Sequence, residues 1–435
     1  MRLARWTEGV TSSRPGGVAA TDWSLYVSES RRLSLQTKDR ETGNAHAPLM
    51  LTDSCLAHYL IMWEDGLVSR GRMERRELEE WVAGSLSAAR AAAYDDPDAA
   101  CVLGPAEFPR VRLEDESIAR AVAGETTPLV ERWRLVDEKV RDGGFRTWSG
   151  SIHVSETESR VVTSRGLDVA SRGTSLTWFV SVDGEIGAGH TARAFEPLIQ
   201  YSTRLDRLMD HARRLREPGI PIPGGVRDVV LHPEVVETLV LGTLLHHLDG
   251  ATVAHGEGRF RREGFVSGNR VLRDDFTLRL DPLIPLRSGS YRFTHEGLPA
   301  ATCVYVERGC LITPVAGLKY ARRLGMKPTP IPYALDTLFL EGPEPLSEGD
   351  AFAAAAGGAL VLSVLGVHTL DAASGDFSLF APQVLRLSPS GPKGRLRATI
   401  SGNLFALLSS ESLRLVRFQG EHVPGLWVRC RLDPR

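Results

Sequence analysis

Three histidines gather within ten residues in the second half of the sequence: His246, His247 and His255. Imidazole is the commonest ligand of zinc-type ions, so this cluster is a candidate metal site. Adjacent side chains on a helix diverge, however, and the acidic group of a catalytic zinc site is missing. His246 follows Leu239 by seven residues and His247 follows Val240 by seven, so both rings are expected to flank an apolar helix stripe. The spacing favours packed histidines over a metal site.

Five cysteines offer a second set of potential ligands, but their number is odd and none stands in Cys-x-x-Cys spacing. This pattern argues against a disulfide framework and a structural zinc site, and it favours a reducing compartment. They are Cys55, Cys101, Cys303, Cys310 and Cys430. Cys430 is interpreted as a lone buried thiol in a final strand. Residues 1–20 lack the apolar run of an export signal and predict a disordered leader, so we expect a cytoplasmic protein.

The charge and the length of uncharged segments narrow the class of protein further. The 435 residues carry 52 Lys and Arg against 54 Asp and Glu, a formal charge of −2, which excludes the basic footprint of a nucleic-acid binder. Residues 351–370 have no formal charge and could suggest a membrane span. Their opening is mostly alanine and a Gly357-Gly358 break follows, so a buried helix, a turn and a strand are expected and no membrane partner.

The spacing of apolar residues predicts the strands and helices that position these side chains. Period-two alternation predicts strands over 23–36, over 58–63 and, as two or three antiparallel strands, over 149–182. Helical spacing of apolar residues predicts helices over 74–94 and 196–216. The first half is therefore expected to be an α/β domain whose helices cover a sheet.

A Pro- and Gly-rich stretch, EPGIPIPGG, follows and places a domain boundary near residue 217. A strand over 226–231 then leads to Pro233 at a first helical position, and the helix should run to about Leu248. Frequent Gly between period-two stretches indicates that the remainder is mostly strands. We predict an α+β protein: an N-terminal α/β domain over 21–217 and a β-rich C-terminal domain of mostly antiparallel strands over 218–435.

Three segments of the second half resemble the TldD/PmbA family, of the TldE-like kind. They are VVLHPEVVETLVLGTLLHHLDGATVAHGEGRF at 229–260, GSYRFTHEGLPAATCVYVERGCL at 289–311, and the stretch 358–408 with SGDFSL and SGNLFALL. The second segment is similar to the family's Asp-Asp-Glu-Gly turn, and the third is similar to its Thr-Gly-Asp-Phe-Ser and Gly-Asn-Leu signatures. On this resemblance, candidates for a peptide groove are His295, Glu296, Gly297, Gly402 and Asn403.

Catalytic members of the family resemble one another in a His-Glu-x-x-x-His helix, whose imidazoles bind zinc while the Glu activates water. Aligned at 244–251, the motif keeps its first histidine as His246. His247 then stands at the base position and Ala251 at the second ligand position. A methyl group binds no cation, so the resemblance implies no zinc and no cofactor in this chain, with zinc held by a partner subunit.

The resemblance therefore implies a TldE-like subunit of a TldD/TldE-type metallopeptidase complex, in a family also called modulators of DNA gyrase. Its partners would be a TldD-like catalytic subunit and small unstructured peptides, bound as an added strand. Two alternatives stay open. One is an autonomous metallopeptidase with a rebuilt zinc site at His246, His247 and His255. The other is a peptide-binding scaffold without a protease partner.

Overall fold

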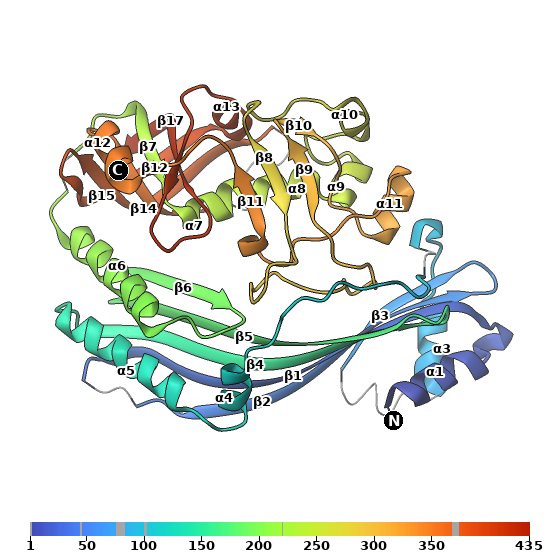
Figure 1. Cartoon of the computed structure of the whole chain (residues 1–435). Helices are drawn as coiled ribbons and strands as arrows, with labels where there is room; N and C mark the ends of the chain where they lie inside the picture. The colour runs from blue at the N-terminus through green and yellow to red at the C-terminus, as the bar shows by residue number, and fades with distance from the viewer. Residues whose placement is uncertain (1, 44–45, 75–82, 100–101, 220, 368–373) are drawn as a thin grey trace.

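A computed structural model describes residues 2–43, 46–74, 83–99, 102–219, 221–367 and 374–435. The first layer is a six-stranded antiparallel sheet in the order β3-β2-β1-β4-β5-β6 (Figure 1). Its strands are β1 (Ala20–Glu41), β2 (Leu49–Trp63), β3 (Val68–Glu74), β4 (Thr147–Thr163), β5 (Asp168–Val182) and β6 (Ile186–Ala192). The predicted strands 23–36, 58–63 and 149–182 all lie in this sheet, which confirms them. Alternation of buried and exposed residues along β4 and β5 is what the period-two pattern encodes.

Helices cover one face of this sheet toward its β6 end. They are α4 (Glu116–Val122), α5 (Thr127–Asp142) and α6 (Leu198–Arg216), the last close to the predicted helix 196–216. Apolar side chains of α5 and α6 pack against Ile152, Leu176 and Trp178 of the strands in one continuous core. That core continues into the second layer through Leu362 and Phe418. Thus α6 is packed between the two layers (Figure 1).

The other end of the sheet carries α1 (Arg2–Ser12), the short turn η1 (Pro15–Gly17) and α3 (Ala83–Ala91). Trp6 and Val10 of α1 are fully buried, and the Trp6 ring lies edge-on to Trp23 at 5.3 Å. The expected disordered leader over 1–20 is therefore wrong for the described residues, because two large apolar side chains anchor the helix to the sheet. Of the predicted helix 74–94, Glu74 ends β3 and positions 75–82 lie outside the described residues.

The second layer contains a seven-stranded sheet in the order β12-β16-β17-β15-β14-β13-β7. An additional pairing of β17 with β7 closes five of its strands into a barrel. The strands are β7 (Gly225–Leu231), β12 (Leu346–Ser347), β13 (Ala359–Leu365), β14 (Asp376–Ser388), β15 (Gly391–Asn403), β16 (Arg414–Arg417) and β17 (Gly425–Pro434). The α+β class and the β-rich second half are confirmed.

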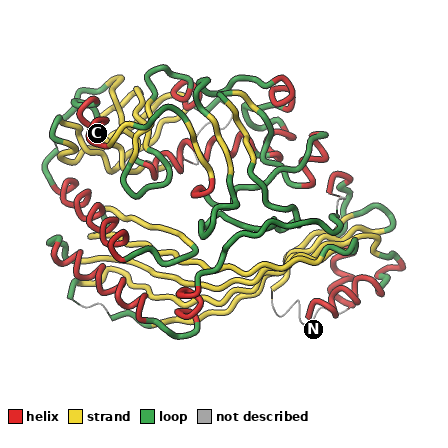
Figure 2. The backbone as a smooth tube through the Cα atoms, in the orientation of Figure 1, coloured by secondary structure: helices red, strands yellow, loops and turns green. Residues whose placement is uncertain are grey.

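A second sheet of this layer has four strands in the order β10-β9-β8-β11: β8 (Thr277–Leu280), β9 (Cys303–Glu307), β10 (Cys310–Leu311) and β11 (Leu338–Glu341). The predicted helix from Pro233 to Leu248 is present as α7 (Pro233–Val235), the π-helical turn η3 (Val236–Leu241) and α8 (Gly242–Leu248). Around these lie α9 (Gly250–His255), α10 (Arg262–Ser267), α11 (Leu318–Leu324), α12 (Glu348–Ala354) and α13 (Leu404–Leu408), with single turns η2 (Pro97–Ala99) and η4 (Leu335–Thr337). Figure 2 shows how the helices surround the strands of this layer.

The uncharged segment 351–370 forms the end of α12, a turn at Gly357-Gly358 and the buried strand β13, as predicted up to residue 367. Gly357 has a φ of 88°, which a glycine adopts without strain. Within the described ranges, no helix is both long and apolar enough to cross a bilayer.

Candidate functional site between the two layers

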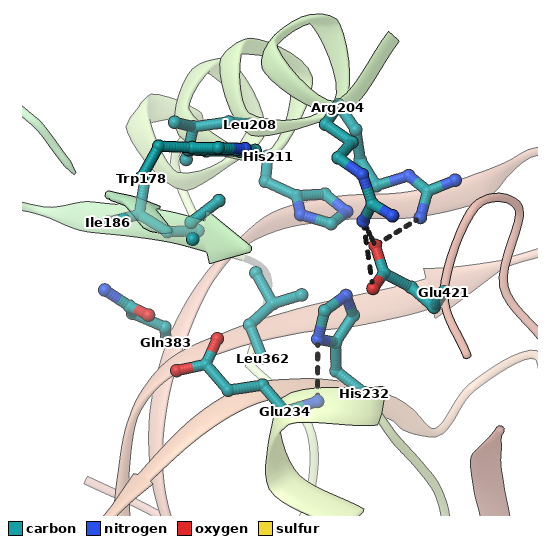
Figure 3. A pocket seen from close by; sticks show the side chains of 14 residues that line it. Trp178, Ile186, Arg204, Leu208, His211, His232, Glu234, Leu362, Gln383 and Glu421 are labelled. Carbon is teal, nitrogen blue, oxygen red and sulfur yellow. Dashed lines mark hydrogen bonds and ion pairs between the residues drawn. The ribbon is translucent and has the colours of Figure 1, made fainter. Parts of the chain in front are cut away.

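A small cavity of about 60 Å³ lies where α6, the β5–β6 edge and the start of α7 meet (Figure 3). It collects polar groups that lie far apart in the sequence. One wall comes from the first layer and α6, and the other from α7 and the barrel. Its charged and polar lining residues are Arg204, Arg207, His211, His232, Glu234, Gln383 and Glu421.

His232 stands at the junction of β7 and α7, where it caps the helix. Its Nδ1 accepts a hydrogen bond from the backbone N–H of Glu234 at 3.4 Å, while its Nε2 is buried without a hydrogen-bond partner. The ring packs edge-on against His211 of α6 at 5.7 Å and against Phe418 at 5.1 Å. Burial lowers the pKa of His232, and burial likewise lowers the pKa of His211 to about 4. Both imidazoles are therefore neutral at pH 7, because the apolar surroundings disfavour their charged forms.

Glu421 reaches the cavity from the loop that precedes β17 and meets two arginines of α6. Its Oε1 lies 3.2 Å from Nη1 of Arg204 and 3.4 Å from Nη1 of Arg207. Arg204 also contacts Glu196 at 3.2 Å and donates to the carbonyl of Gly420 at 2.6 Å. This network joins α6 to the second layer through partly buried charges, which are screened less than surface pairs.

Two carboxyls of the helix α7–η3, those of Glu234 and Glu237, form no ion pair with any cationic side chain that the structure describes. Burial raises the pKa of Glu234, and the charge of Glu421 raises it further. Glu234 keeps contact with solvent, but the protein around the cavity mouth desolvates its carboxyl. The pKa of Glu237 rises to about 7, through burial first and then through Glu421 and Glu234. A carboxyl that titrates near neutral pH can exchange protons with a bound polar group.

A metal ion does not fit the donors present. Among the residues that the structure describes, no group of three His, Cys, Asp or Glu side chains could hold one. His232 and Glu237 nevertheless stand five residues apart, the spacing of the two histidines in a His-Glu-x-x-x-His helix. In this register Pro233 occupies the position of the catalytic Glu, and proline carries no proton-accepting group. Neither this register nor the one at 246–251 has both histidine ligands and the catalytic Glu of the motif.

The predicted histidine cluster lies outside this cavity. His247 is fully buried, packs on Phe260 and Phe405, and accepts a hydrogen bond at Nδ1 from the backbone N–H of Arg259 at 3.0 Å. The prediction of a packed histidine is confirmed for His247. It is wrong for His246, which is exposed, because its side chain is turned away from the core by one helical step. His255 is also exposed.

The predicted groove residues fall into two separate places. His295, Glu296 and Gly297 form a turn that faces the first sheet, where His295 lies edge-on to Tyr26 at 6.5 Å. Gly297 has a φ of 85°, and a Cβ there would meet Leu167 at 2.5 Å, so both backbone and packing require glycine. Glu296 accepts a hydrogen bond from the backbone N–H of Leu318 at 2.8 Å, at the start of α11.

Gly402 and Asn403 end β15 and lead into α13. Asn403 caps that helix by accepting from the backbone N–H of Ala406 at 3.0 Å. The pair thus leads into α13, whose Phe405 contacts His247, whereas the turn at His295 faces the first sheet. Cys430 is buried, and burial raises the pKa of its thiol to about 12, which confirms the lone buried thiol.

Sequence reasoning missed the residues of the cavity, which are His211, His232, Arg204, Arg207 and Glu421. One signal was available at His232: a histidine at a strand end, directly before a helix, with glutamates two and five positions later. Glutamates in the first turn of a helix also suit its dipole, so this spacing does not by itself distinguish a site from a helix start. The α6 arginines carry no comparable signal, because a charged face is the rule on amphipathic helices.

Residues 224–427 match the family model described as the PmbA/TldA metallopeptidase C-terminal domain. The second half of the chain therefore carries a C-terminal domain of the kind found in this metallopeptidase family. Residues 224–427 are thus a TldD/PmbA-family domain, which confirms the sequence resemblance for this half of the chain.

One curated relative and several solved structures are similar to the chain. A metalloprotease of Methanothermobacter thermautotrophicus is 30% identical over 109 residues, which span 25% of this chain and only 23% of that relative. A proposed modulator of DNA gyrase from Bacteroides thetaiotaomicron has a TM-score of 0.80 at 15% identity, over 100% of this chain and 98% of that one. TldE from Thermococcus kodakarensis has a TM-score of 0.74 at 15% identity, with 99% of both chains covered. A proposed modulator of DNA gyrase from Thermotoga maritima has a TM-score of 0.76 at 18% identity, over 99% and 100%. At these identities the structures show a shared fold over the whole chain.

Proposed function

We propose that this chain is the TldE-like, non-catalytic subunit of a TldD/TldE-type metallopeptidase complex. It pairs with a TldD-like subunit that holds the zinc, and it contributes part of the cleft in which small unstructured peptides lie. The scattered cysteines favour a reducing compartment, so the complex would work in the cytoplasm.

The cavity between the layers carries this proposal. His232 is followed by Pro233 where a catalytic carboxylate is needed, and the described donors do not assemble into a three-ligand set. Metalloproteases need both a ligand set and a base for the attacking water. The likeness of the whole chain to TldE from Thermococcus kodakarensis supports the same role.

Zinc content and partner dependence test the proposal together. The purified chain is dialysed against zinc, its metal is measured by mass spectrometry, and cleavage of a flexible labelled peptide is followed. We expect less than stoichiometric zinc and no cleavage by the chain alone. Cleavage should appear on mixing with a TldD-like protein of the same organism, and a Glu→Gln change in that partner's motif should abolish it.

Other results discriminate the alternatives. Stoichiometric zinc together with unaided cleavage would overturn the subunit role and favour an autonomous enzyme, in which case His246→Ala should remove both properties. Peptide binding without any complex with a TldD-like protein would favour the scaffold.

A further inference from the structure

A groove lined by arginines crosses the interface between the layers, apart from the cavity of Figure 3. It has a volume of about 520 Å³ and is lined by Arg110, Arg112, Arg172 and Arg292 together with Leu113, Ser171 and others. A narrower section of about 220 Å³ shares Arg172 and Arg292 and adds Arg193 and aromatic side chains. Five guanidinium groups thus line two neighbouring hollows that share four lining residues.

Main-chain hydrogen bonds to both layers fix the wall of this groove. The segment 102–114 runs without regular secondary structure between the first sheet and the second layer (Figure 2). The carbonyl of Leu113 accepts from the N–H of Thr174 in β5 at 2.9 Å, and the carbonyl of Arg112 accepts from the N–H of Leu286 at 2.9 Å. The hollow is therefore preformed, which lowers the entropic cost of binding a ligand.

The guanidinium charges of the groove are poorly compensated. Arg292 is held by the carbonyls of Pro109 and Ala170, both at 3.0 Å, and neither accepting group carries a charge. Arg193 likewise donates to three carbonyls. In the described part of the chain, neither forms an ion pair with a carboxylate; burial lowers the pKa of Arg193, and the charge of Asp336 offsets this only in part.

The exposed arginines add to this positive potential. Arg110 and Arg112 also have no carboxylate partner among the described residues. Arg172 meets Glu158 at 3.3 Å, but both side chains are more than half exposed, and such pairs contribute little. Glu114 is the one carboxyl among the described residues that line the wider section. A cleft lined predominantly by one sign of charge concentrates ligands of the opposite sign.

We propose that this arginine groove binds the carboxylate side chains of extended, acidic peptides, an inference that rests on the proposed function and names its substrate class. Guanidinium groups match carboxylates in a two-point geometry. The narrow section offers Tyr26, Tyr291 and Phe293 to a neighbouring apolar side chain. A nucleic acid fits less well, because phosphate recognition uses an extended basic surface and this chain has a net charge of −2.

Fluorescence anisotropy with the full chain tests this proposal. The probe is a short labelled peptide that alternates Glu with Leu, and its control has Gln at each Glu position. We expect the Glu peptide to bind on the order of tenfold more tightly, and this preference to shrink as salt rises. The double variant Arg110→Gln/Arg172→Gln should lose the preference, whereas Arg110→Lys/Arg172→Lys should retain part of it.

A matched control removes two exposed arginines elsewhere, Arg120→Gln/Arg431→Gln, and both of these sit in exposed ion pairs, as Arg172 does. This variant should bind like the parent, and all variants should share its thermal midpoint. Equal binding of the Glu and Gln peptides, or unchanged binding by Arg110→Gln/Arg172→Gln, would overturn the proposal. So would tighter binding of a single-stranded oligonucleotide, or of citrate, than of the Glu peptide. Complex formation with a TldD-like protein is a separate readout, so the groove can fail while the subunit role stands.

Discussion

Arg204 of α6 and Glu421 of the second layer lie 217 residues apart in the sequence and 3.2 Å apart between Nη1 and Oε1. Glu421 also accepts from Arg207 at 3.4 Å, so the two guanidinium groups share this carboxylate, while Arg204 also meets Glu196 at 3.2 Å and Arg207 meets Glu348 at 3.6 Å. Neither arginine side chain is more than 19% exposed, so the loss of their shared partner leaves partly buried charge. This network is the clearest polar connection between the two layers.

Glu421→Gln tests that connection, because it keeps the shape of the side chain and removes its charge. We expect the free energy of unfolding to fall by about 1–2 kcal/mol. Urea denaturation followed by tryptophan fluorescence measures it. Glu344→Gln is the control, since its pair with Arg417 is largely exposed and should contribute under about 0.5 kcal/mol. Equal effects of the two substitutions would contradict the interpretation.

The carboxyl of Glu237 predicts a pH dependence of stability. Its pKa is about 7 in the folded protein and near 4.5 when unfolded, so the folded state holds the proton more tightly. Stability from this group is therefore full below about pH 4.5 and is lost as pH rises toward 7. Glu237→Gln should stabilise the protein at pH 8 by roughly 1–2 kcal/mol, after allowance for solvent screening, and have little effect at pH 4.5.

Titration of His211 changes the stability with pH in the opposite direction to titration of Glu237. Its folded pKa is about 4, below the ordinary value of 6.5, so stability is lost as pH falls from 6.5 toward 4. In the parent protein, the loss of stability with rising pH from Glu237 partly cancels the gain with rising pH from His211. Urea midpoints measured between pH 4.5 and 8 should therefore rise more steeply with pH in Glu237→Gln than in the parent. A parallel shift at every pH would show that Glu237 does not titrate in this range.

His247 and His246 form a matched pair of adjacent histidines. His247→Ala should lower the free energy of unfolding by about 2–4 kcal/mol, because it leaves a cavity against Phe260 and Phe405. His246→Ala should change it by less than about 0.5 kcal/mol, since the side chain is exposed. Chemical denaturation measures the free energy of unfolding of both variants and shows whether they differ. A loss of bound zinc in both variants would instead support a metal site.

Gly297 should not tolerate a side chain. Gly297→Ala places a Cβ at 2.5 Å from Leu167 and holds alanine at a φ of 85°. We expect a loss of about 2–3 kcal/mol, part from backbone strain and part from the clash across the layers. Gly184→Ala isolates the strain, because its φ of 67° is also positive while no atom lies within 4 Å of the added Cβ. Thermal unfolding should therefore show the smaller change for Gly184→Ala.

Local pattern alone determined much of the fold. The period-two stretch over 149–182 predicted the hairpin of β4 and β5, and Pro233 predicted the start of α7. These features depend on neighbours along the chain, through strand alternation and the fixed φ of proline. The family resemblance came from contiguous segments for the same reason.

Tertiary structure decided the composition of the site. His211, His232 and Glu421 come from a helix of the first half, a strand end and a late loop, and no spacing in the sequence links them. Periodicity reports which face of an element is buried, but not which element that face meets. Periodicity also did not separate two adjacent residues of one helix. It assigned both His246 and His247 to the apolar side, but only His247 is buried. The sequence thus determined the elements and the family, while the docking of α6 between two layers brought the polar groups together, because long-range contacts depend on the complementarity of whole surfaces.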